Sequence, residues 1–424
     1  MSVPPKPPPK PPPKPSPYAA FAIPAYRDYL AGTTLVSIGT AGQGLAIGFE
    51  LYQRTGSAMS LAWVGLLQAL PMLLLTLPAG VLADRIDRRL IMLFGLGGAT
   101  LTSIGLGLLS YFEGPIGWMY FILFMDAVFL RTAWPARTAL LPMIVPRETF
   151  ENAVKWRSSS GQLSALLGPA LGGFVLAWSV PATYFIAAGS SLLFIVLLLR
   201  LRVDTKPPPS TTPKGMAGVF GDLVEGLSFV WRRKILLGTI SLDFFAVLLG
   251  GTVYLLPIFA EDILGVGEIG LGLLWSAPAA GALCTALTLA YLPPMRRAGV
   301  TMLVCIVGFG LATVAFGLST NFWLSLAMLF LTGVFDNVSV VVRHTLIQLA
   351  TPDAMRGRVS AVSAVFIGSS NELGGFESGA VAALFTPVIS VVSGGVGTIV
   401  VVAIWAELFP DIRKLRGLAD EHSA

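Results

Sequence analysis

The sequence predicts an all-α membrane protein whose twelve spanning helices form two parallel repeats of six. Three observations predict this class: a hydrophobic share of 54%, a charged share of only 12%, and an internal repeat across the 424 residues. Soluble domains carry about 25% charged residues, whereas this chain has a mean hydropathy of +0.77. A polytopic membrane protein follows from the composition alone.

The polar residues exclude several function classes. The net charge of +5 comes from basic loops, and no Lys/Arg run with interleaved aromatics predicts a nucleic-acid partner. Cys284 and Cys305 fall inside apolar runs, and His344 and His422 have no partner at metal-ligand spacing, so we expect neither a disulfide nor a metal. We expect no cofactor and no enzyme, because the chain lacks a Gly-rich phosphate loop and a nucleophile paired with a base.

Residues 1–17 consist almost entirely of proline and lysine. Proline at this density favours an extended polyproline II segment, so we expect a solvated cytoplasmic tail. The tail lacks the apolar core of a signal peptide, and we expect no cleavage. Docking to an anionic membrane leaflet or to a polyproline-binding partner is the alternative role.

Twelve apolar segments follow the tail, each close to the ~20 residues that a bilayer core requires. Their polar faces must line protein or water rather than lipid. The expected spans lie near residues 29–51, 60–83, 90–111, 117–140, 151–178, 181–200, 235–258, 269–291, 299–317, 322–345, 357–384 and 388–409.

The charged run Gly80-Val-Leu-Ala-Asp-Arg-Ile-Asp-Arg-Arg89 separates the second and third segments and predicts a tight turn outside the hydrocarbon. Basic residues of short loops stay in the cytoplasm, and of the 28 Lys and Arg only Arg54 falls in a loop on the opposite side. We therefore expect both termini in the cytoplasm and the chain in the plasma (inner) membrane. Gly80 would let two helices approach closely, and Asp84 with Arg85 and Arg88 would form a charged latch.

A linker divides the chain after residue 200. The run 206–213 is Pro-rich, and the apolar residues after it recur at helical spacing with Asp222 and Glu225 on the opposite face. This pattern predicts an amphipathic helix along the inner membrane surface. The expected organisation is a tail at 1–17, a first half at 18–200, a linker at 201–234, a second half at 235–410 and a C-terminal tail at 411–424.

The two halves repeat each other. A shift of about 206 residues lays Gly32-Thr33 on Gly238-Thr239 and Arg137 on Arg343. Each half holds six spans, an even number, so the halves share one orientation in the membrane. Parallel six-span repeats place a central cavity where the halves meet.

The turn after the second segment resembles the loop motif of the major facilitator superfamily, G-x-L-A-D-R-x-G-R-R. Asp87 replaces a glycine, and the matching residues are Gly80, Leu82, Asp84, Arg85, Arg88 and Arg89. The resemblance implies a carrier whose halves rock about a central site, with the latch stabilising the outward-open state. Replacing glycine by aspartate puts the backbone geometry of the turn in question, because glycine alone accepts left-handed angles freely.

Other runs resemble the enterobactin-exporter branch, which carries siderophores and drugs. They include Arg356-Gly-Arg358-Val-Ser and Ser370-Asn-Glu-Leu-Gly374, and the likeness covers roughly residues 20–415. Gly168-Pro169 on the fifth segment is similar to a signature of exporters in this superfamily. The resemblance implies export of a small organic molecule and does not name it.

Charged and polar residues at bilayer depth are candidates for function, because an ionised group there costs at least about 2.5–3.5 kcal/mol. The candidates for proton coupling or for the substrate cavity are Asp126, Arg131, Asp243, Asp336, Arg343, Asn371, Glu372 and Glu377. Asp126 and Arg131 are five residues apart on one segment. They form either a structural ion pair or a proton site whose proton affinity changes when the arginine moves.

Asp243 has no basic residue one turn away along its segment. It is either a proton carrier, because burial favours its neutral form, or a hydrogen-bonding group across the interface of the halves. Asp336, Glu372 and Glu377 could face one another or Arg343 from neighbouring segments. A structural role for each of these acids is the alternative.

Together these features predict a proton-coupled exporter of small organic molecules, siderophore-like or drug-like, which works by alternating access. The expected partners are the substrate, protons and the lipid bilayer, and we expect a monomer. An importer or a flippase for lipid-like molecules with the same fold is the alternative within transport. A membrane sensor or scaffold that binds partners through its Pro-rich tail is the alternative from another class.

Overall fold

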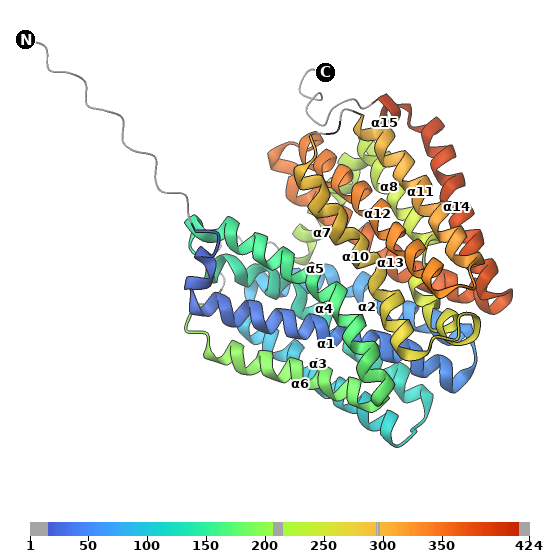
Figure 1. Ribbon diagram of the computed structural model, residues 1–424. Coiled ribbons are helices and arrows are strands. Elements are labelled where there is room, and N and C mark those ends of the chain that lie inside the picture. The colour runs from blue at the N-terminus through green and yellow to red at the C-terminus, as the bar shows by residue number, and fades with distance from the viewer. Residues whose placement is uncertain (1–15, 207–214, 294, 296, 415–424) are drawn as a thin grey trace, which may run out of the picture.

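The computed structural model describes residues 16–206, 215–293, 295 and 297–414, which form helices and connecting turns without a strand (Figure 1). Expectations for residues 1–15, for the Pro-rich run 207–213, for Arg296 and for the last ten residues of the tail lie outside this described part.

Six long helices form the first half. Serines precede the second and sixth helices. Ser57 and Ser179 accept hydrogen bonds from the backbone N–H groups of Met59 and Ala182 and so cap these helices. The helices are α1 (Pro24–Thr55), α2 (Ala58–Arg85), α3 (Arg88–Tyr111), α4 (Ile116–Ile144), α5 (Arg147–Trp178) and α6 (Val180–Arg200).

The second half repeats this design after the linker helix α7 (Met216–Arg232). Its helices are α8 (Lys234–Leu249), α10 (Gly267–Tyr291), α11 (Ala298–Leu318), α12 (Phe322–Ala350), α13 (Asp353–Leu384) and α14 (Pro387–Leu408), and a short helix α15 (Pro410–Lys414) ends the described chain. The span expected at 235–258 is interrupted after α8 and continues through η2 (Thr252–Leu255), α9 (Leu256–Ile258) and η3 (Phe259–Ile263). Gly251 lies at this break against the backbone of Gly374, where a Cβ would come within 2.4 Å of a carbonyl oxygen.

Eleven helices of the described chain are long and apolar enough to cross a membrane, the interrupted span Lys234–Ile263 counting as one. The twelfth, α13, is as long as α1 and α5 but richer in polar residues, which include Asn371 and Glu372. It packs between α2 of the first half and α8 of the second, so protein rather than lipid covers much of its length. The expected twelve-helix fold is confirmed.

The internal repeat is visible in the packing of the helices. In the first half α1 packs on α6, α2 on α4, and α3 on both α4 and α6. In the second half α8 packs on α14, α10 on α12, and α11 on both α12 and α14. The two most extensive contacts between the halves, α2 with α13 and α5 with α10, exchange under the same correspondence. The halves are therefore related by a pseudo-two-fold axis, as expected for parallel repeats.

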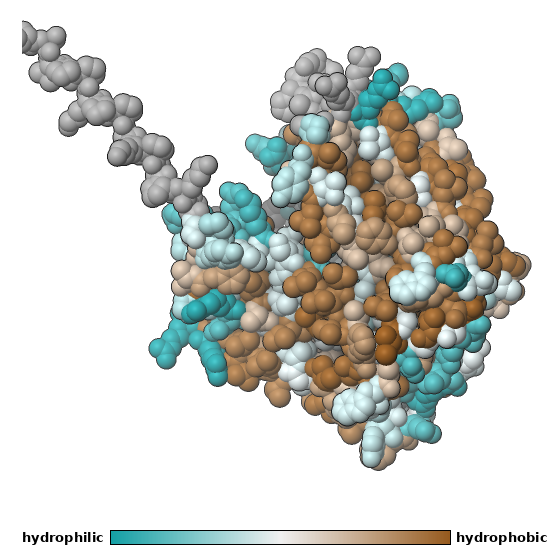
Figure 2. Space-filling view, in the orientation of Figure 1, coloured by the Kyte–Doolittle hydropathy of each residue, from teal (hydrophilic) through white to brown (hydrophobic). Residues whose placement is uncertain are grey.

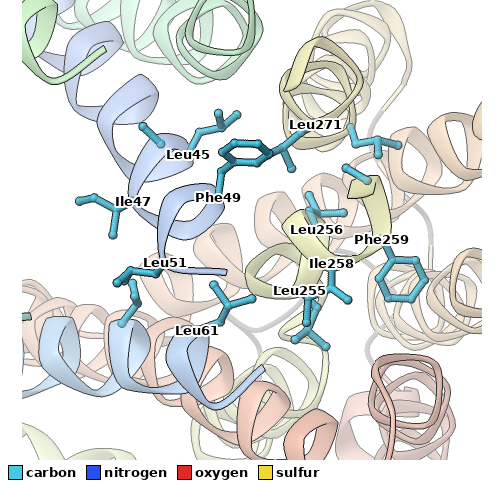
Figure 3. Close-up of a cluster of buried hydrophobic side chains, with 14 of the residues drawn as sticks. Leu45, Ile47, Phe49, Leu51, Leu61, Leu255, Leu256, Ile258, Phe259 and Leu271 are labelled. Carbon is cyan, nitrogen blue, oxygen red and sulfur yellow. The ribbon is translucent and has the colours of Figure 1, made fainter. Parts of the chain in front are cut away.

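The halves meet at the distal end, which we define as the end of the bundle opposite residues 16 and 414, the first and last that the structure describes. A single apolar core there includes Leu45 and Phe49 of α1, Leu61 of α2, Leu256 after the break, and Leu271 of α10. Figure 3 shows these side chains facing one another from both halves. At the other end, which we call the terminal end, the buried apolar clusters each belong to one half only. The space-filling outline is indented between the halves at that end (Figure 2).

Glycines allow the close approach at the distal end. A Cβ on Gly272 of α10 would lie 2.6 Å from the carbonyl oxygen of Pro169 and 2.9 Å from the Cα of Gly173, both on α5. A Cβ on Gly65 of α2 would lie 2.7 Å from the backbone nitrogen of Phe376 on α13. Contacts this short with backbone atoms leave no space for a side chain, so small residues set the distance between the halves.

We expect Gly272→Val to weaken closure of the distal end, because the backbone atoms that it meets cannot move aside. Spin labels at Gln53, near the distal end of α1, and at Thr320, in a distal loop of the second half, should report a longer or broader distance distribution than in the parent protein. Gly97→Val is the matched control, because a Cβ on Gly97 has nothing within 4 Å. An unchanged distance in Gly272→Val would contradict this account of the distal contact.

The linker helix α7 lies against the start of α13. Arg358 of α13 binds both Asp222 and Glu225 of α7 through nitrogen–oxygen contacts of 2.9 Å. A stripe of apolar residues on α7 is exposed: Phe220, Val224, Leu227 and Trp231. The acidic face thus anchors α7 to the second half. The apolar stripe lies on the opposite side of α7, as an amphipathic helix at a membrane surface requires.

Candidate functional site

A substantial cavity lies within the first half. Its volume is about 470 Å³, and its walls come from α1 to α6. Most of the wall is apolar, and its polar lining is formed by Ser37, Thr40, Gln43, Gln68, Asp126, Arg131, Arg137 and Ser164. An apolar cavity with a few convergent polar groups is the usual form of a small-molecule site.

Asp126 of α4 is held by a hydrogen-bonded chain within the first half. Thr102 donates to one carboxylate oxygen at 2.6 Å, and the amide of Gln43 donates to the other at 3.1 Å. Ser103 in turn donates to the amide oxygen of Gln43 at 2.6 Å. The expected ion pair between Asp126 and Arg131 is wrong. Five residues turn a helix by about 500°, which leaves the two side chains about 140° apart.

Arg131 instead pairs with the other half. Its guanidinium contacts the carboxylate of Glu372 on α13 at 2.6 Å. The hydroxyl of Tyr254, in η2, donates to the second oxygen of the same carboxylate at 2.5 Å. This cluster joins α4 of the first half to two elements of the second, beside the cavity that Arg131 lines.

Asp243 of α8 forms an ion pair with Arg343 of α12. The two side chains are only 8% and 4% exposed, so the pair lies inside the second half. The expected hydrogen bond of Asp243 across the interface of the halves is wrong, because its partner Arg343 comes from the same half. The role of Asp243 as a proton carrier stays a prediction. Arg343 lies on a different helix, so a search for basic residues one turn away from Asp243 along its own helix could not identify it.

Of the remaining predicted residues, Asp336 lies near the ion pair of Asp243 and Arg343, whereas Glu377 and Asn371 bond within their own helix. Asp336 lines a small cavity of about 20 Å³ together with Asp243 and Ser339. Glu377 accepts a hydrogen bond from the neighbouring Ser378 at 3.3 Å. Asn371 is exposed and donates to a carbonyl of its own helix.

Two polar clusters were missed by the sequence analysis. Tyr254 has no charge and lies in the helix break, so only the structure reveals its contact with Glu372. Glu50 is buried at the distal end of α1, where it accepts from Tyr184 at 2.8 Å and pairs with Arg54 at 3.3 Å. This pair could have been predicted, because Glu50 and Arg54 are four residues apart on one helix.

The predicted latch is not formed in this conformation. Asp84 and Arg85 are exposed, and a Cβ on Gly80 would meet nothing within 4 Å, so the expected close helix approach at Gly80 is absent. Arg88 donates to the carbonyl of Ala139 at 3.1 Å rather than to Asp84.

Asp87 takes a structural role in the same turn. It has φ −53°, outside the left-handed region, and its carboxylate caps α3 by accepting from the backbone of Arg89 at 2.9 Å. Thr205 of the linker donates to the same oxygen at 2.5 Å. The turn therefore does not need the glycine that Asp87 replaces.

Over residues 15–419 the chain matches the sequence profile of the transmembrane secretion effectors, a family of the major facilitator superfamily (MFS). The chain belongs to this family. It is similar to the enterobactin exporter EntS of Citrobacter koseri, with 28% identity over 385 residues that cover 90% of this chain and 91% of the relative. The EntS protein of Shigella boydii is also 28% identical over 386 residues, with the same coverage of both chains.

Solved structures of low sequence identity share the fold of this MFS chain. A mutant of the nucleoside transporter NupG superposes with a TM-score of 0.74 at 12% identity and covers 91% of this chain and 100% of that one. A bacterial homologue of the human lysosomal transporter Spinster gives a TM-score of 0.67 at 16% identity, over 92% of this chain and 97% of that one. The predicted superfamily and fold are confirmed, and the chain is a multi-pass membrane transporter.

Proposed function

We propose that this transporter is a proton-coupled exporter of small organic molecules that works by alternating access. The observation that supports this most directly is the ion pair of Arg131 and Glu372, which joins the halves beside the cavity of the first half. An ion pair between two moving bodies can be made and broken during each cycle. It therefore offers a way to link a proton to the position of the halves.

The proposed orientation places both termini in the cytoplasm, on the basis of the basic residues in the loops at the terminal end. With this orientation, the apolar core at the distal end closes the outer side, and the halves separate on the inner side. This is the conformation that receives a substrate from the cytoplasm. The similarity to relatives named as exporters supports the outward direction.

Glu372 is the proposed proton carrier. In the present conformation its carboxylate is held by Arg131 and Tyr254. A proton on Glu372 removes its charge and with it the Coulomb attraction to Arg131, while the Tyr254 hydroxyl still orients the carboxyl group. Protonation thereby frees α4 to move relative to α13.

The latch at Asp84 is proposed to act in the opposite state. In the present conformation the terminal part of α2 has open space at Gly80. When the terminal ends of the halves close, a neighbouring helix can approach Gly80, and Asp84 gains a partner there. The latch would then stabilise the outward-open state. We propose a monomer as the functional unit, since one chain contains both halves and the cavity.

Inverted membrane vesicles test the proposed function. They should be prepared from cells that lack their own exporters and given an acidic interior, with a panel of siderophores, macrolides and dyes outside. We expect at least one compound to accumulate in vesicles that contain the transporter and to leave when a protonophore collapses the gradient. Accumulation only in right-side-out vesicles would make the protein an importer. Accumulation that persists in the presence of the protonophore would exclude proton coupling.

A further inference from the structure

We propose that Arg137 forms a subsite for an anionic group of the substrate, such as a carboxylate, at the wall of the cavity in the first half. The inference rests on the proposed function in one respect only, namely that this cavity holds the transported molecule. Nothing in the comparisons assigns a role to Arg137 or a charge to the substrate of this chain.

The internal repeat reveals the asymmetry behind this proposal. The shift of 206 residues that lays Arg137 on Arg343 also lays Ser37 on Asp243. The structure shows the same correspondence in space: Arg343 forms an ion pair with Asp243, and Arg137 donates through Nη2 to the hydroxyl of Ser37 at 3.1 Å. The second half therefore neutralises its arginine with an acid, whereas the first half supplies only a neutral hydroxyl at the equivalent position.

Within the described part of the chain, no acid compensates Arg137. Asp126, the one acid in the cavity wall, has its two oxygens bound by Thr102 and Gln43. The other arginine of the wall, Arg131, is paired with Glu372. Arg157 of α5 adds a second positive charge that interacts with Arg137. The positive charge of Arg137 is thus uncompensated next to an open cavity.

An anion is the ligand that such a site fits. A cation in a partly desolvated pocket is stabilised by a counter-charge, and a guanidinium matches the planar fork of a carboxylate. Arg137 lies over the ring of Trp134, with 5.6 Å from its guanidinium carbon to the ring centroid. The side chain of Trp134 is 59% exposed and lines the same cavity, so it offers a flat surface to an aromatic or apolar body. The expected substrate class is an organic anion with an apolar or aromatic part.

Calorimetric titration of the purified full-length chain in detergent tests this subsite with two probes of the same shape, naphthalene-2-carboxylate and naphthalene-2-carboxamide. The parent protein should bind the carboxylate at least about ten-fold more tightly than the amide, the size expected of a charge-assisted hydrogen bond. Arg137→Gln should reduce this ratio to about two-fold or less. Ser37→Asp should do the same while Arg137 is still present, because it copies the ion pair of the second half.

Ser37→Asn is the matched control for Ser37→Asp, because asparagine has nearly the same size without the charge. It should keep the preference for the carboxylate. Equal binding of the two probes by the parent protein would overturn the proposal, and so would a preference that survives in both Arg137→Gln and Ser37→Asp. The titration needs neither a proton gradient nor flux. Loss of proton-driven export in vesicles would therefore contradict the proposed function and leave the subsite standing.

Discussion

Replacing Asp243 by alanine is expected to destabilise the folded transporter by about 3–5 kcal/mol, because the substitution leaves Arg343 as an unpaired buried charge. The two side chains are 8% and 4% exposed, so bulk water solvates the remaining charge poorly. The pair joins α8 to α12 and is the main polar contact that we find between these helices. The free energy of unfolding, measured by SDS titration in mixed micelles, gives the result directly.

The double variant with Asp243→Ala and Arg343→Met is the control for this measurement. It removes both charges and fills most of the arginine volume, so we expect it to regain a large part of the lost stability. A single Asp243→Ala variant within about 1 kcal/mol of the parent protein, the size expected of an exposed ion pair, would contradict the buried pair.

Glu372→Gln is expected to abolish proton movement coupled to substrate, with a decrease of at least ten-fold in the protons moved per substrate molecule. Glutamine has the size of glutamate and can still accept hydrogen bonds from Arg131 and Tyr254, but it cannot take up and release a proton. Downhill substrate movement should continue, because the variant resembles the permanently neutral form. Proteoliposomes with a pH-sensitive dye inside report both quantities in one experiment.

Glu377→Gln supplies the matched control, since it makes the same change five residues further along α13. Glu377 bonds to Ser378 on its own helix, and no contact with the first half is found for it in the described structure. We expect coupling in this variant to match the parent protein. If Glu377→Gln loses coupling and Glu372→Gln keeps it, the proton carrier is not at the ion pair between the halves.

Local patterns in the sequence predicted the fold, because the bilayer imposes its requirement for apolar residues on each span separately. Each span needs about 20 apolar residues in a row, and the bilayer enforces that requirement segment by segment. The repeat could be predicted for a similar reason. Gly32 and Gly238 each lie where an aromatic side chain leaves no space for a Cβ: Phe194 of α6 in the first half, and Phe409, directly after α14, in the second. The same lack of space for a Cβ in both halves requires glycine at both positions.

The partners of the charged residues could not be predicted, because they are set by contacts between distant helices. Arg131 and Glu372 are 241 positions apart, and nothing along α4 indicates that the arginine reaches the other half rather than Asp126. The break after α8 and its Tyr254 arise from close backbone packing against α13, which hydropathy does not register. The list of candidate residues was therefore more accurate than the interactions that we expected among them.

The central claim is that the two halves rock as bodies, so that one end closes as the other opens. Distances between spin labels test it most directly, with one pair at Gln53 and Thr320 on the distal end and another at Glu148 and Gln348 on the terminal end, on a background without native cysteines. Acidification in lipid nanodiscs should lengthen the distal distance and shorten the terminal one in the same population. Two distances that stay fixed, or that change in the same direction, would contradict alternating access in this transporter.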